Sequence, residues 1–145
     1  TEDMPAIKDH WVKEGIRFAA IYTGYLGSFE QIQLVGKFFD DFRGENTLIY
    51  CDPAMADHGK LYGGFPENFP KEMTRLCAKA DIITPNITEA AFMVDMPYCE
   101  APHSEEYIKG LHDGLRKITD GKIVLTGTGK ELLASEEIKK AYLGG

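Results

Sequence analysis

Four short stretches of the chain are continuously apolar, and segments with a helical repeat separate them. We expect strands in these stretches, over residues 17–22, 47–51, 81–84 and 122–126. Because the stretches do not alternate between apolar and polar positions, they suit strands that are covered on both faces. The pattern therefore predicts a sheet that lies between layers of helices.

The clearest helical pattern covers residues 29–43, where the apolar positions step by three, four and three residues. Ser28 with Gln31 fits a capping box at its start, and Gly44 fits a C-terminal stop. Further helices are expected over residues 5–14, 67–79, 104–119 and 135–143, and directly after Thr88. The alternation of strands and helices predicts an α/β fold class, with a parallel, Rossmann-like sheet flanked by helices.

Length and charge limit the possible functions. The chain has 145 residues, which suits one domain or part of one. Its 16 Lys and Arg against 23 Asp and Glu give a formal net charge of −7, so nucleic acid and anionic membranes are poor candidates as partners. No apolar run approaches the roughly 20 residues of a membrane helix, and residues 1–13 show no secretory signal. We therefore expect a cytoplasmic protein with no nucleic-acid or membrane partner.

The residues that follow the expected strands carry the candidate chemistry, because ligands of open parallel sheets bind beyond the carboxyl ends of the strands. Asp52 and Asp57 follow the second expected strand, and Asn86 and Glu89 follow the third. Carboxylate and amide oxygens suit Mg²⁺ and, through it, nucleotide phosphates. The alternative is that Asp52 and Asn86 are ordinary turn residues beside prolines.

Residues 52–66, which are rich in glycine, indicate a long and mobile connection.

Three motifs resemble those of pyridoxal kinases of the ribokinase-like superfamily. They read GYLGSFEQ at residues 24–31, CDPAMADHGKLY at 51–62 and ADIITPNITEA at 80–90. The likeness covers about residues 1–126. It implies transfer of phosphate from ATP, with Mg²⁺, to the 5′-hydroxyl of pyridoxal, pyridoxine or pyridoxamine, so that a B6 vitamer would be the small-molecule substrate.

The resemblance also implies roles for individual residues. Tyr25 matches a tyrosine that lies near the vitamin ring in the family. The residues matched to the ATP site are Asp52, Thr84, Asn86, Glu89 and Thr126. The acids matched to the metal site are Asp52, Asp57 and Glu89. Phosphoryl transfer depends on alignment and charge neutralisation, which such residues supply.

The chain departs from the family where the catalytic base is expected. In the family a C-terminal Gly-Thr-Gly-Asp motif supplies the base, and this motif is missing here. Residues 127–130 read Gly-Thr-Gly-Lys and look like it, but they follow the fourth expected strand too early in the chain to be that motif. A protonated lysine cannot accept the hydroxyl proton. The N-terminal strands that carry much of the family's vitamin pocket are also missing. We therefore identify no catalytic residue and expect weak or absent kinase activity from these residues alone.

Residues 127–145 resemble the C-terminus of ATPase subunits of branched-chain amino-acid ABC transporters. We therefore expect two parts, the central portion of a pyridoxal kinase-like α/β domain over residues 1–126 and a helical tail of different origin. Such a partial domain leaves sheet edges open, which promotes self-association. The alternative to an enzyme is a non-catalytic α/β fragment or chimera that acts only as a binding or interaction module.

Overall fold

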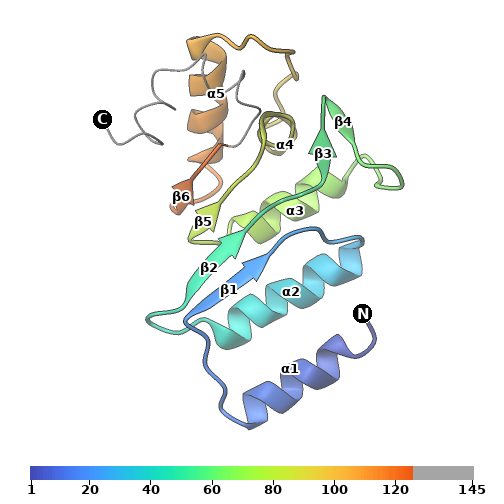
Figure 1. The fold of residues 1–145 in the computed structure, drawn as a ribbon, viewed down its shortest axis with the longest axis vertical. Coiled ribbons are helices and arrows are strands. Elements are labelled where there is room, and N and C mark those ends of the chain that lie inside the picture. Colours follow the sequence, from blue (N-terminus) through green and yellow to red (C-terminus); the bar gives the residue numbers. More distant parts are fainter. Residues whose placement is uncertain (126–145) are drawn as a thin grey trace.

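A computed structural model describes residues 1–125 and shows a four-stranded parallel sheet (Figure 1). In spatial order its strands are β1 (Ala20–Thr23), β2 (Leu48–Cys51), β5 (Ile82–Ile83) and β6 (Lys122–Ile123). A separate antiparallel pair joins β3 (Ala56–Asp57) to β4 (Lys60–Leu61). The parallel sheet confirms the predicted fold class, with strands shorter than the apolar stretches. The β3–β4 hairpin lies inside the segment expected to be a mobile connection.

Helices fill the connections between the parallel strands. Within residues 1–125 they are α1 (Met4–Lys13), α2 (Phe29–Phe42), α3 (Phe69–Cys77), α4 (Ile87–Met93) and α5 (Glu105–Leu115). Each was expected from the sequence pattern, and Ser28 caps α2 as predicted, because its hydroxyl accepts the Gln31 N–H at 3.2 Å. The predicted capping box is not closed, because the Gln31 side chain accepts the Gly27 N–H at 2.6 Å and not that of Ser28. None of these helices has the length and apolarity that a membrane span requires. The helix predicted over residues 135–143 lies outside the described residues.

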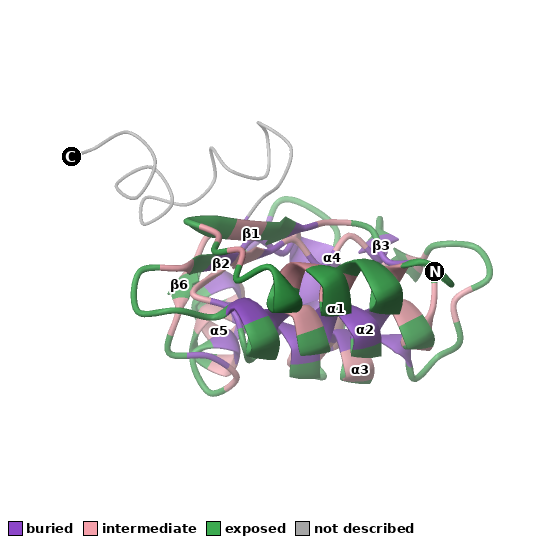
Figure 2. Cartoon of the chain, turned by 90° about the horizontal axis from the view of Figure 1, so that it is seen from below, coloured by how far each residue is buried: buried purple, intermediate pink, exposed green. Residues whose placement is uncertain are grey.

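The sheet is covered on one face by α2, α3 and α5, and α1 packs against α2, as Figure 2 shows from below. The sequence pattern predicted helices on both faces of the sheet. In the described part of the chain, helices cover only this one face. The strand order is the physical reason: each right-handed crossover moves the chain one strand further in the same direction, so its helices stay on the same side. On the opposite face Tyr22 is 66% exposed, and Leu48, which pairs with Ala20, is also exposed.

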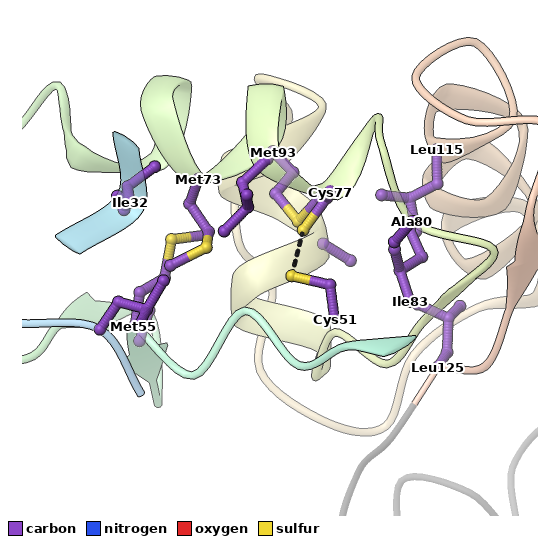
Figure 3. Close-up of a cluster of buried hydrophobic side chains, with 14 of the residues drawn as sticks. Ile32, Cys51, Met55, Met73, Cys77, Ala80, Ile83, Met93, Leu115 and Leu125 are labelled. Atoms are coloured by element: carbon purple, nitrogen blue, oxygen red, sulfur yellow. Dashed lines mark hydrogen bonds between the residues drawn. The ribbon is translucent and has the colours of Figure 1, made fainter. Parts of the chain in front are cut away.

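The core lies between the covered face of the sheet and the helices (Figure 3). Ile49 and Cys51 of β2 and Ile83 of β5 are fully buried there, together with Met73 and Cys77 of α3. The Sγ atoms of Cys51 and Cys77 are 3.6 Å apart. All three cysteines of the chain are free.

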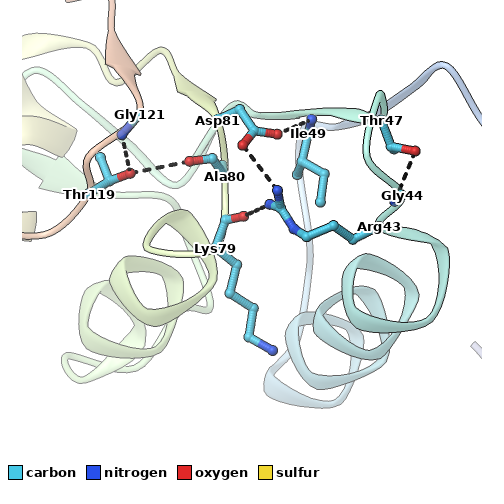
Figure 4. A network of polar contacts seen from close by, with 9 residues as sticks. All are labelled: Arg43, Gly44, Thr47, Ile49, Lys79, Ala80, Asp81, Thr119 and Gly121. Atoms are coloured by element: carbon cyan, nitrogen blue, oxygen red, sulfur yellow. Dashed lines mark hydrogen bonds and ion pairs between the residues drawn. The ribbon is translucent and has the colours of Figure 1, made fainter.

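A polar network fixes the amino edge of the sheet, where the strands begin (Figure 4). Arg43, just after α2, donates to Asp81 at 3.0 Å and also to the Lys79 carbonyl. The other carboxylate oxygen of Asp81 accepts the Ile49 N–H at 2.7 Å. Gly121 packs so tightly here that a Cβ atom would lie 2.6 Å from the Ala80 carbonyl oxygen. The network ties α2, β2 and β5 together at the edge away from the predicted site.

Candidate active site

The predicted site residues of the described chain gather at the carboxyl edge of the sheet. Tyr25 follows β1, Asp52 directly follows β2, and Thr84 directly follows β5. Glu89, in the first turn of α4, reaches the chain just after Asp52, since its Oε1 accepts the Met55 N–H at 3.0 Å. Asp52 and Glu89 therefore lie at the same edge, as the strand-end argument requires. Thr126 lies outside the described residues.

Asp52 presents a half-buried carboxylate at the end of β2. Its Oδ2 accepts the Tyr22 hydroxyl at 3.3 Å, and its backbone N–H continues the β1–β2 pairing by donating to the Thr23 carbonyl at 2.8 Å. Burial raises the pKa of Tyr22, and the charge of Asp52 raises it further. The Tyr22 phenol therefore stays protonated and donates to the carboxylate, whose Oδ1 also accepts the Ala54 N–H at 3.5 Å.

Glu89 is the most enclosed acid of the site, with 2% of its surface exposed. Its Oε1 accepts the N–H groups of Met55 at 3.0 Å and Ala56 at 3.4 Å, and its Oε2 accepts the Asn86 N–H at 2.8 Å. Asn86 completes a capping box by accepting the Glu89 N–H at 2.9 Å. Burial raises the pKa of Glu89, and the three N–H groups offset part of that rise.

The β3–β4 hairpin carries Asp57 beside the site. Its two turn residues, His58 and Gly59, have φ values of 48° and 73°, as a tight hairpin turn with two left-handed residues needs. Asp57 is exposed, and its Oδ2 lies 3.5 Å from Nε2 of His58. A His-Gly pair is a weak form of the Asn-Gly hairpin signal, which is why the sequence pattern indicated a loop here.

Aromatic side chains line the approach to these acids. Tyr25 is 62% exposed and stacks on Phe65 with ring centroids 5.6 Å apart, and Phe65 stacks in turn on Phe69 at 3.9 Å. Tyr62, which the sequence analysis did not select, lies 6.4 Å from Phe65 between ring centroids. Partial burial raises the pKa of Tyr62, and the charges of Glu89, Asp57 and Asp52 all raise it further.

The acids form an open site and not a closed metal cage. Among residues 1–125, no three His, Cys, Asp or Glu side chains come together closely enough to hold a metal ion by themselves. Mg²⁺ commonly keeps several waters and binds one or two carboxylates together with substrate phosphates. A half-buried Asp52 at the strand end fits that arrangement, because the protein supplies few ligands there.

Comparison with known proteins places these motifs in a family. The model of the phosphomethylpyrimidine kinase family matches residues 7–142. Pyridoxal kinase PdxY of Actinobacillus pleuropneumoniae is 37% identical over 75 residues, which are 48% of this chain and 25% of that protein. The origin predicted for residues 127–145, outside the described part, stays a prediction.

Solved structures share the fold. The pyridoxal kinase of Lactobacillus plantarum superposes with a TM-score of 0.77 at 27% identity, over 89% of this chain and 45% of that one. A candidate phosphomethylpyrimidine kinase of Bacteroides thetaiotaomicron, in a crystal form with pyridoxal, gives 0.78 at 43% identity, over 87% and 44%. The chain thus spans less than half of these structures. The match over most of its length confirms the resemblance drawn from the three motifs, and the chain belongs to the phosphomethylpyrimidine kinase family.

Proposed function

We propose that this chain forms the metal- and nucleotide-binding part of a kinase that transfers phosphate from ATP to the 5′-hydroxyl of pyridoxal, pyridoxine or pyridoxamine. The observation that carries the proposal is the convergence of Asp52 and Glu89 at the carboxyl edge of the sheet, within matching family motifs. The crystal form of the Bacteroides thetaiotaomicron relative with pyridoxal, at 43% identity, supports a B6 vitamer as substrate.

In this proposal the acids bind a metal and the aromatic residues bind the vitamin. The chemistry that a bound Mg²⁺ would supply here is neutralisation of the charge that develops during transfer. Asp52 and Asp57 would hold the ion at the strand end, with Thr84 and Asn86 lining the nucleotide side. The exposed ring of Tyr25, held by its stack on Phe65, offers a flat apolar surface for a pyridine ring. These residues align the reactants, which is the main contribution that phosphoryl transfer needs from a protein.

The proposal limits the activity of these 145 residues alone. The sequence shows no Gly-Thr-Gly-Asp motif, which carries the catalytic base in the family. We therefore propose nucleotide binding with little or no turnover. The second candidate, a non-catalytic interaction module, is favoured by the uncovered sheet face with exposed Tyr22 and Leu48, which would promote self-association.

Equilibrium binding of ATP by titration calorimetry, with and without Mg²⁺, separates these two candidates. We expect saturable binding that Mg²⁺ strengthens, and Asp52→Asn should weaken the Mg²⁺-dependent binding by about tenfold. Asp120→Asn is the matched control, because this exposed acid lies at the amino edge. Absence of ATP binding in the unmodified chain would favour the interaction module. An equal loss in both variants would contradict the assignment of Asp52.

A further inference from the structure

The buried carboxylate of Glu89 is bound entirely by backbone. A buried carboxylate needs partners to offset its lost hydration, and Glu89 obtains three from the N–H groups of Met55, Ala56 and Asn86. Two of these partners lie in the segment that runs from Asp52 into β3. Oε1 of Glu89 thus holds that segment, and Oε2 closes the start of α4, although the motif predicts a role at the metal.

Asn86 holds the same segment through the backbone carbonyl of Ala56. Its Nδ2 donates to the Ala56 carbonyl at 2.7 Å, while its Oδ1 caps α4. The Ala56 residue at the start of β3 therefore has its N–H bound by Glu89 and its C=O bound by Asn86. Two such bonds to one residue fix the direction in which β3 leaves the sheet edge.

Thr88 holds the turn of the hairpin. Its Oγ1 accepts the Gly59 N–H at 3.0 Å. A Cβ atom at Gly59 would lie 2.5 Å from Cδ1 of Tyr98, so the turn also packs directly against that ring. The first turn of α4 therefore reaches the hairpin at its start, along β3 and at its turn.

We propose that Asn86, Thr88 and Glu89 form a clamp that positions the β3–β4 hairpin, and with it Asp57, relative to Asp52. This inference rests on the proposed nucleotide site, of which the three would be positioning residues. Glu89 then acts through the backbone of residues 55–56 and gives no oxygen to the metal. The clamp also explains why a glycine-rich connection forms an ordered hairpin at this place.

The clamp is tested by amide hydrogen exchange in the whole chain, followed by NMR at Met55, Ala56 and Gly59. Thr88→Val keeps the side-chain shape and removes the acceptor, so exchange at Gly59 should rise by about fivefold to tenfold. Thr88→Ser should restore the slow exchange. Thr74→Val is the matched control, since the Thr74 hydroxyl donates within α3 to the Pro70 carbonyl.

ATP binding in the same variants distinguishes a clamp from a metal ligand. If the clamp positions the site, Thr88→Val and Glu89→Gln should both weaken Mg²⁺-ATP binding and both speed exchange in the hairpin. If Glu89 is a metal ligand, Glu89→Gln alone should weaken it, with hairpin exchange unchanged, and the inference is overturned. Unchanged exchange in Thr88→Val also overturns it. If the unmodified chain binds no ATP, the proposed function fails, while the exchange data still decide whether the clamp exists.

Discussion

Acidic side chains at the two edges of the sheet have different partners. At the amino edge, acids meet cations: Asp81 pairs with Arg43 at 3.0 Å and Asp40 pairs with Lys79 at 2.6 Å. At the carboxyl edge, within the described chain, neither Asp52 nor Glu89 forms an ion pair with lysine or arginine, and neutral donors bind them instead. The amino edge is thus neutralised by the chain itself, whereas the carboxyl edge keeps negative charge that a bound cation can neutralise.

The largest effect on stability is expected from removing the buried acid of the carboxyl edge. Glu89→Ala leaves three N–H groups without their acceptor, two of them in the segment that leads to the hairpin, so it should lower the free energy of unfolding by about 3 kcal/mol. Urea denaturation followed by circular dichroism measures this. Asp113→Ala, which breaks an exposed pair with Lys109 on α5, serves as control and should change the free energy of unfolding far less. Equal losses in the two variants would contradict the role of burial.

The raised pKa of Glu89 gives the carboxyl edge a distinct pH dependence. Because burial raises this pKa above the ordinary value of 4.5, the folded state holds the proton at pH values where the unfolded state has lost it. The contribution of Glu89 to stability is therefore complete below pH 4.5 and falls as pH rises through the raised pKa. The stability of the unmodified chain relative to Glu89→Gln should decline over that window, by about 1.4 kcal/mol for each unit of the rise. A difference that is constant with pH would contradict the raised pKa.

The smallest effect is expected at the amino edge. Arg43→Met breaks a half-exposed ion pair with Asp81, so the free energy of unfolding should fall by about 1 kcal/mol. Mg²⁺-ATP binding should stay as in the unmodified chain, because the amino edge lies away from the proposed site. Thermal unfolding and titration calorimetry of one preparation measure both quantities. Weaker ATP binding in this variant would contradict the claim that the amino edge plays no part in the nucleotide site.

The sequence was sufficient for the elements whose signals are local. The apolar stripe and Ser28 cap of α2 depend on neighbouring positions, and the structure confirms both. The strand ends likewise brought Asp52 and Glu89 to one edge, because parallel topology alone requires it. The metal roles of Asp52, Asp57 and Glu89 stay predictions.

The remaining features depend on contacts between distant residues. Glu89 binds Met55 across 34 positions and Thr88 binds Gly59 across 29, so no local pattern shows that α4 holds a hairpin. The uncovered sheet face was missed for a related reason. An uninterrupted apolar strand suits a sheet with two covered faces. In β1, however, the side chain of Tyr22 is exposed on one face, and that of Thr23 is buried on the other.

The most direct test of the charge difference is NMR relaxation with Mn²⁺ and ATP, in which Mn²⁺ replaces Mg²⁺ as a paramagnetic ion with the same preference for oxygen ligands. The account predicts that amide signals around Asp52 and Asp57 broaden, while those around Arg43 and Asp81 stay sharp. Broadening centred on the amino edge, or no broadening at either edge, would contradict it.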